Sequence, residues 1–354
     1  MSADLTRAHR IELPRLVLVG EDILPAVEDC CMDFGFEKAL VVSGAKTYEV
    51  AGGRVIKILM DSGIYAEHSI VSRGDVEDVD EVINRISRLD AEVVVGVGGG
   101  KVIDVAKLAS YRAQVPFISV PTSASHDGIA SPMAVVKGLD KPHSIRAQTP
   151  LAIIADVDVI SSAPRRFLAS GCGDVIAKCV SVRDWKLAHK VKDEYYGEYA
   201  ASLALMSAKL VMENVSLIKD GVSEGIRTLL EALISCGAAM CIAGSSRPCS
   251  GSEHMFSHAL ELLDPGIKCL HGERCGVGTI MMAYLHDLDW VEIRDKLRTV
   301  GAPTTAKELG VPPELIVKAL TIAHKIRPER YTILGEGGLT KGAAERLAKV
   351  TGVI

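Results

Sequence analysis

Short, almost continuously apolar runs alternate with longer amphipathic stretches from residue 15 to about residue 158. Several runs are rich in Val, Ile and Leu, which is typical of parallel strands that are buried on both faces. The expected strands are residues 16–19, 39–42, 66–71, 91–97, 117–120 and 151–156, and the expected helices between them include 76–89 and 101–112. This alternation of strands and helices predicts an open parallel α/β sheet.

The pattern changes after Pro164, where Ala-, Leu- and Met-rich stretches follow one another without a convincing strand. The expected helices are residues 174–190, 195–214, 225–243, 252–263, 276–286 and 312–326. We therefore predict an α/β, Rossmann-like parallel-sheet domain over residues 1–162, an all-α domain over residues 163–354, and a cleft between them. The apolar stretch 229–244 contains Glu231 and is too short to span a bilayer, so we expect a buried core helix and not an integral membrane protein.

The composition agrees with this picture and removes several classes of function. A chain of 354 residues is long for a single core, which favours two domains. A net charge of -5, without a run of Lys and Arg, argues against a nucleic-acid partner. The N-terminus is polar and does not resemble a secretory signal. Nine cysteines without a CxxC pair predict free thiols in a reducing environment, so we expect a cytoplasmic protein.

A glycine-rich turn, GVGGGKVIDVAK, follows the expected strand 91–97 and opens a helix. Glycines let the backbone approach a ligand closely, and the start of a helix attracts anions. The turn from Gly98 to Val102 therefore favours binding of a pyrophosphate. Such turns also serve only to pack a strand against a helix, and the spacing here departs from G-x-G-x-x-G.

The next expected strand ends in the hydroxyl-rich sequence PTSASHDGIASP. Ligands of open α/β sheets bind at the carboxyl edge of the strands, where this loop would lie. An ordinary Ser/Thr turn would account for the hydroxyls, but not for His126 and Asp127 in their midst. The loop is therefore a second candidate for the binding site.

Three of the ten histidines lie between residues 254 and 271. His254 and His258 are four residues apart on an expected helix and share one face, while His271 precedes a glycine at a helix entrance. Upstream, SGCGD places Asp174 at the start of another expected helix. Two imidazoles and one carboxylate with open positions are typical of a catalytic divalent-metal site. Spacing alone leaves four such arrangements open, and it does not distinguish His254 from His258.

The segments GGGKVIDVAK, PTSASHDGIASPMA, SGCGD, SGSEHMFSHALE and CLHGERCGVG together resemble the sn-glycerol-1-phosphate dehydrogenases of archaea. That family shares a superfamily with glycerol dehydrogenase, iron-containing alcohol dehydrogenases and dehydroquinate synthase. The resemblance implies reversible, NAD(P)H-dependent reduction of dihydroxyacetone phosphate to sn-glycerol 1-phosphate for archaeal ether phospholipid biosynthesis. It also implies a catalytic divalent metal, usually Zn²⁺. As partners we expect this small-molecule substrate and further copies of the chain in a homo-oligomer.

The resemblance further implies roles for individual residues and separates His254 from His258. Asp174, His254 and His271 would hold the metal, while Asp127, Asp174 and His258 would contact the substrate and act in catalysis. The residues that would hold the cofactor are Gly98, Gly99, Gly100, Lys101, Val102, Thr122, Ser123, Ala124 and Ser125, with Ser131 nearby.

The reduced carbonyl oxygen needs a proton, and a substrate phosphate needs cations. His258 or a water molecule at the metal would supply the proton, with His126 and Asp127 as an alternative relay. The adenosine end of the cofactor would lie near residues 43–47. The candidate cations are Lys141, His143 and Arg146, although a solvated turn explains that segment about equally well.

Three other functions remain open at this level. A glycerol or other small-polyol dehydrogenase would use the same site without a need for phosphate. A lyase similar to dehydroquinate synthase would use the same cofactor and metal and would release phosphate. A binding protein without catalysis has no evident use for a cofactor turn beside an open metal site.

Overall fold

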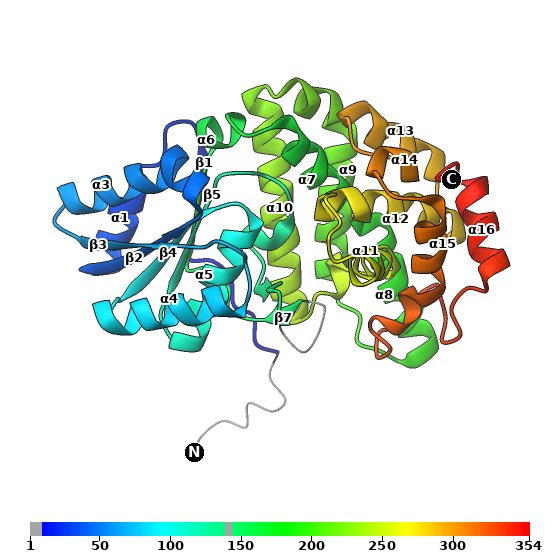
Figure 1. The fold of residues 1–354 in the computed structure, drawn as a ribbon, viewed down its shortest axis with the longest axis horizontal. Helices are drawn as coiled ribbons and strands as arrows, with labels where there is room; N and C mark the ends of the chain where they lie inside the picture. Colours follow the sequence, from blue (N-terminus) through cyan, green and yellow to red (C-terminus); the bar gives the residue numbers. More distant parts are fainter. Residues whose placement is uncertain (1–8, 139–143) are drawn as a thin grey trace, which may run out of the picture.

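The computed structural model describes residues 9–138 and 144–354, and Figure 1 shows an α/β part beside a helical part. Within the described residues, one sheet has six parallel strands in the order β1-β8-β5-β4-β2-β3. The strands are β1 (Leu16–Gly20), β2 (Lys38–Ser43), β3 (Tyr65–Ile70), β4 (Val93–Gly98), β5 (Phe117–Pro121) and β8 (Ala152–Asp156). All six expected strands are confirmed.

Helices cover both faces of this sheet. They are α1 (Ala26–Asp33), α3 (Gly53–Asp61), α4 (Val76–Leu89) and α5 (Gly100–Ala113). Successive residues of a strand point to opposite faces. Val93 and Val95 of β4 accordingly pack with α1 and α3, whereas Val94 packs with α4 and α5. Burial on both faces explains why the strand sequences are almost continuously apolar.

The described chain after β8 consists of helices joined by turns. They include α6 (Val157–Ser161), α7 (Arg165–Ile176), α8 (Lys178–Lys192), α9 (Glu198–Asp220), α10 (Ser223–Ala243), α11 (Ser252–Leu263), α12 (His271–Leu285), α13 (Trp290–Val300), α14 (Ala306–Leu309), α15 (Pro313–Ile322) and α16 (Lys341–Val350). Their apolar sides form one core, which also takes in Ile153 and Ala155 of β8. This core joins the helical part to the sheet.

Among the described residues, α9 and α10 are long and apolar enough to cross a membrane, judged by length and composition alone. However, Leu229, Leu233 and Cys236 of α10 are fully buried within the protein. This helix packs on α9 and α7 and also contacts β1, and Figure 1 shows it between the sheet and the other helices. The core helix expected at residues 229–244 is therefore confirmed.

The helix boundary around Asp174 differs from the expectation. The residue lies near the end of α7, which begins after Pro164, and not at the start of a helix. Glycine normally weakens a helix interior, and this led to the wrong boundary. Here a Cβ at Gly173 would lie only 2.2 Å from the carbonyl oxygen of Gly272, so close packing of α7 against α12 requires glycine within the helix.

Two further elements were not expected from the sequence. One is a short antiparallel ribbon of β6 (Met133–Ala134) and β7 (Ile145–Arg146) beside α5. The other is α13, whose sequence WVEIRDKLRTV is rich in charge. This helix buries only Ile293, Leu297 and Val300, so its apolar stripe is narrow and its periodic signal is weak.

Candidate active site

The glycine turn between β4 and α5 forms one wall of the candidate site. A Cβ at Gly98 would lie 2.5 Å from the Cβ of Val102, and one at Gly100 would lie 1.7 Å from Nε2 of His126. Neither position has room for a side chain, so the local sequence is dictated by packing as well as by the turn. The first N–H groups of α5 lie at this turn, at the carboxyl edge of the sheet.

An outer cavity of about 590 Å³ lies against this turn. Thr47 donates a hydrogen bond to the Val97 carbonyl oxygen (3.0 Å), which ties the wall near residues 44–47 to β4. Phe167 and Leu270 line the opposite side, on the helical part. The predicted cofactor residues that line this cavity are Gly99, Gly100, Lys101, Val102, Thr122, Ser123 and Ser125.

An inner cavity of about 240 Å³ adjoins the outer one. Its lining includes Asp127, His254 and His258, and four residues line both cavities: Gly100, Lys101, His126 and His271. The two cavities lie between the sheet edge and the helical part, so the predicted cleft is confirmed. A ring in the outer cavity would therefore lie next to a small ligand in the inner one.

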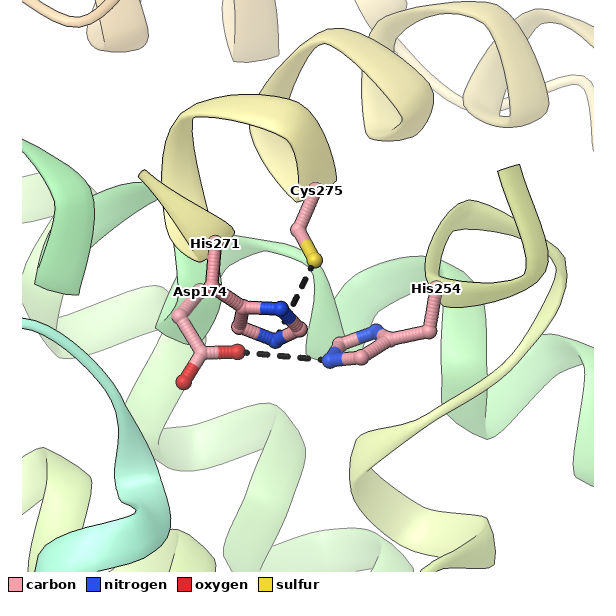
Figure 2. Close-up of side chains that lie close together, drawn as sticks. All are labelled: Asp174, His254, His271 and Cys275. Carbon is pink, nitrogen blue, oxygen red and sulfur yellow. Dashed lines mark hydrogen bonds and ion pairs between the residues drawn. The ribbon is translucent and has the colours of Figure 1, made fainter. Parts of the chain in front are cut away.

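Figure 2 shows the side chains of Asp174, His254, His271 and Cys275 pointing toward one another from three helices. Their donor atoms all lie within 4.8 Å of one another. The distance from Asp174 Oδ1 to His254 Nε2 is 3.5 Å, and that from Cys275 Sγ to His271 Nε2 is also 3.5 Å. In a tetrahedral zinc site, adjacent N and O donors are about 3.3 Å apart, and adjacent N and S donors about 3.6 Å. The donor set thus fits a divalent metal such as zinc.

A buried carboxylate orients His254 within this group. Glu253 Oε1 lies 2.7 Å from His254 Nδ1 and also accepts a hydrogen bond from the Gly251 N–H (2.8 Å). The contact at Nδ1 turns Nε2 toward Asp174. Carboxylate partners of this kind fix the orientation of histidine ligands in metal sites.

The fully buried Lys178 connects the metal group to the substrate loop. Its Nζ lies 2.7 Å from Asp127 Oδ2 and 2.8 Å from Asp174 Oδ1. The Asp127 N–H donates to the other oxygen of Asp174 (2.8 Å). Burial alone would lower the pKa of Lys178, but the two carboxylates outweigh it and hold that pKa well above its usual value. The ammonium therefore fixes both acids in place.

The two imidazoles of the donor group differ in protonation. Burial and the neighbouring His254 hold the pKa of His271 well below its usual value, so this ring is neutral and has a lone pair to offer. Burial would also lower the pKa of His254, but Cys275, Asp174 and Glu253 outweigh it and raise that pKa. A site that attracts a proton in this way also attracts a metal cation, which would replace the proton.

Some predicted residues lie elsewhere than expected. Ser131 lines the inner cavity and not the outer one. Gly98 packs under Val102, and the Ala124 carbonyl oxygen would lie 2.1 Å from a Cβ at Gly171, so both residues serve the packing of the walls.

The predicted phosphate cations do not lie in the inner cavity as far as the structure describes them. Arg146 is exposed on β7 and lines a separate small cavity with Glu12 and Thr149. Its side chain is directed there because Ile145, its neighbour, packs into the core beside the sheet. Lys141 and His143 lie outside the described residues.

Three residues at the site were missed by sequence reasoning. Lys178 follows Asp174 by four residues, and Cys275 follows His271 by four, which is the spacing that places side chains on one helix face. That signal was present and unused. Glu253 had no such signal, because adjacent helix residues point in different directions and its contact depends on side-chain reach.

Replacing Lys178 by methionine is expected to lower the free energy of unfolding by about 3–5 kcal/mol, because two buried carboxylates lose their counter-charge. Urea unfolding in the presence of a chelator would measure this change. Lys192→Met removes an exposed ion pair with Glu336 and should leave the free energy nearly unchanged. Equal stabilities of the two variants would contradict the bridging role of Lys178.

Comparison with known proteins identifies the relatives of this chain. It is 55% identical to the glycerol-1-phosphate dehydrogenase [NAD(P)+] of Hyperthermus butylicus, over 98% of this chain and 99% of that one. It is also 55% identical to the enzyme of the same name from Pyrococcus furiosus, over 98% and 100% of the two chains. The relative from Methanosarcina mazei is 53% identical over 98% and 97%.

Solved structures agree on the fold. Glycerol dehydrogenase from Schizosaccharomyces pombe superposes with a TM-score of 0.81 at 20% identity, covering 97% of this chain and 90% of that one. A probable glycerol dehydrogenase from Sinorhizobium meliloti has a TM-score of 0.80 at 19% identity, with 97% and 98% covered. The family model described as iron-containing alcohol dehydrogenase matches residues 18–164. With relatives this similar over nearly its whole length, the chain belongs to the glycerol-1-phosphate dehydrogenase family.

Proposed function

We propose that this chain catalyses the reversible, NAD(P)H-dependent reduction of dihydroxyacetone phosphate to sn-glycerol 1-phosphate. The observation that carries the proposal is the junction of the two cavities at Gly100, His126 and His271. This junction places a cleft with a helix N-terminus beside a cavity with a metal-donor set. The name that the relatives share supplies the substrate. The product is the backbone of archaeal ether phospholipids, so the enzyme serves lipid biosynthesis.

We assign the metal to Asp174, His254 and His271, whose donor atoms fit a divalent cation such as zinc. When bound, the metal supplies Lewis-acid polarisation of the substrate carbonyl. A fourth position must stay available to the substrate, so Cys275 is a neighbour of the site in this assignment and not a ligand. Glu253 keeps the His254 ring oriented.

The outer cavity is assigned to the nicotinamide cofactor. The turn at Gly99 to Val102 and the hydroxyls of Thr122, Ser123 and Ser125 line it. The helix start at Gly100 suits a pyrophosphate, and residues 44–47 line the part left for the adenosine end. These residues position the reactive ring, and the hydride chemistry belongs to the cofactor.

Substrate contact and proton transfer are assigned to Asp127, Asp174 and His258. Asp127 lies in the loop after β5 and is held by Lys178, so its position in the inner cavity is fixed before substrate arrives. His258 lies one helical turn from His254 and lines the same cavity. It is our candidate for the group that delivers a proton to the reduced oxygen. His126, at the junction of the cavities, is the alternative.

At the level of the whole molecule, the chain is a soluble enzyme that acts on a small molecule. We further propose a cofactor-binding domain over residues 1–162 and a metal- and substrate-binding domain over residues 163–354. A cytoplasmic location and a homo-oligomeric state are part of the same proposal.

The test is an NADH and NADPH oxidation assay with dihydroxyacetone phosphate, with and without a chelator. We expect activity that is lost with the chelator, restored by Zn²⁺, and yields the sn-1 enantiomer. Faster turnover of dihydroxyacetone and glycerol than of their phosphates would instead identify a polyol dehydrogenase. Release of inorganic phosphate without net oxidation of the cofactor would identify a lyase.

A further inference from the structure

Three arginines gather behind the inner cavity with too few carboxylates to match them. Arg247 and Arg327 have only 3% and 4% of their side chains' surface exposed. Arg247 is paired with Glu194, with Nε 2.8 Å from Oε1. Among the ion pairs of the described residues, neither Arg327 nor Arg330 has a carboxylate partner. The group therefore has an excess of buried positive charge, which is unfavourable without an anion.

The electrostatics of the cluster reflect this excess. Burial and the nearby Arg327 and Arg247 lower the pKa of Arg330 to about 9. Burial also lowers the pKa of Arg327. In addition, Nε of Arg327 and Nη1 of Arg247 are buried and have no hydrogen-bond partner among the described residues. Buried donors of this kind normally have an acceptor.

Two hydroxyls connect the arginines to the inner cavity. Ser246 Oγ accepts hydrogen bonds from Arg330 Nη2 (2.9 Å) and Arg327 Nη1 (3.4 Å). Ser144 Oγ accepts one from Arg327 Nη2 (2.7 Å). Both serines line the inner cavity. An oxygen that accepts two N–H groups must direct its own proton elsewhere, so the Ser246 O–H is available to an acceptor in the cavity.

The other cations around the inner cavity are already engaged or open to solvent. Arg274 donates to Ser257 Oγ (3.1 Å), to the Cys269 carbonyl oxygen (2.7 Å) and to Glu261 (3.2 Å). Arg73 is largely exposed and is paired with acidic residues of its own loop and helix. The arginine cluster is thus the place where an anion would gain most.

We propose that Arg327 and Arg330, acting with Ser246 and Ser144, form the subsite that binds the phosphate of the substrate in the inner cavity. A phosphate dianion offers several acceptor oxygens and matches the excess charge, and arginine binds it in a planar, bidentate geometry. This inference rests on the proposed function and identifies the residues that select a phosphorylated ketone over the free one. Arg247, fixed by Glu194, supports the field of the pair.

A purely structural clamp is the competing explanation. Arg330 Nη1 does donate to the Ser250 carbonyl oxygen (2.5 Å), which ties the segment after α15 to the turn before α11. A clamp would not require two neighbouring guanidinium groups without carboxylates, nor donors left without acceptors. It also would not distinguish substrates, and this difference is the basis of the test.

The experiment measures kcat/KM of the metal-loaded enzyme for dihydroxyacetone phosphate and for dihydroxyacetone, in the wild type and in Arg327→Met and Arg330→Met. Each variant is expected to lose about 10- to 100-fold with the phosphorylated substrate, the range for a buried charged hydrogen bond. The rate with dihydroxyacetone should change less than about threefold, and inhibition by inorganic phosphate should weaken in parallel. Arg298→Met, an exposed arginine on α13, is the matched control.

Ser246→Ala keeps all three arginines, so it tests the subsite if an arginine variant fails to fold. It should lose about tenfold with the phosphorylated substrate alone. Equal losses with both substrates, or no loss with either, would overturn the subsite in favour of a clamp. A phosphate-specific loss in Arg73→Met or Lys137→Met, but not in the Arg327 and Arg330 variants, would overturn it too. A wild-type enzyme without activity on dihydroxyacetone phosphate would instead contradict the proposed function.

Discussion

His271→Ala is expected to release the divalent metal and to lower kcat/KM for dihydroxyacetone phosphate by at least about 10³-fold, because Lewis-acid polarisation contributes several kcal/mol to such reactions. The ring of His271 lies between His254 and His126, with centroid distances of 5.0 Å and 6.2 Å, so it belongs both to the donor group and to the junction of the cavities. Metal content measured on the purified protein, together with the rate, checks the result.

Two companions make this experiment specific. Cys275→Ala removes the donor one turn further along α12, and we expect it to keep the metal because the substrate needs the remaining position. His189→Ala removes an exposed histidine at the end of α8 and should keep both metal and rate. Full activity of His271→Ala in a metal-free state would contradict the metal assignment. Loss of metal in Cys275→Ala would make the thiol a fourth ligand.

His258→Ala is expected to retain the metal and to lower kcat by about 10²-fold or more, the contribution of a positioned proton donor. His254 belongs to the donor group, whereas His258 lines the cavity one turn away with its ring centroid 6.0 Å from that of His271. Metal content and kcat, measured side by side in His254→Ala and His258→Ala, separate the two roles.

The pattern of losses decides the assignment. His254→Ala should lose both the metal and the activity. Partial recovery of His258→Ala by added imidazole would support proton transfer, since a free base can replace the missing side chain. If His258→Ala released the metal, that residue would be a ligand and the division between the two histidines would be wrong.

The parallel sheet was predictable because its strands are buried on both faces, so the segments around Val41 and Val95 are apolar without interruption. The start and end of α4 also agree with the prediction, because Asp75 caps the first turn and Asp90 takes the left-handed conformation after the last. The boundary near Asp174 was not predictable in the same way. Its helix contains glycines that favour a break locally and that only packing against α12 explains.

The sequence by itself determined the alternation of strands and helices, the glycine turn at Gly98 to Gly100, and the residue types of a metal site. These features are local, since they depend on backbone freedom and on the periodicity of side chains. It left four possible donor sets and two equivalent histidines. The tertiary structure groups His254 with Asp174 and His271, from three separate helices.

The tertiary structure alone also revealed Lys178 between two acids, and Arg327 and Arg330 behind Ser246. Each of these groups brings together residues that lie tens of positions apart in the chain. Their charges acquire meaning only through burial, because a charge without a partner is costly inside a protein and nearly neutral in its effect on the surface. Periodicity says which face of a helix is buried, but not which charged groups of other helices meet it there.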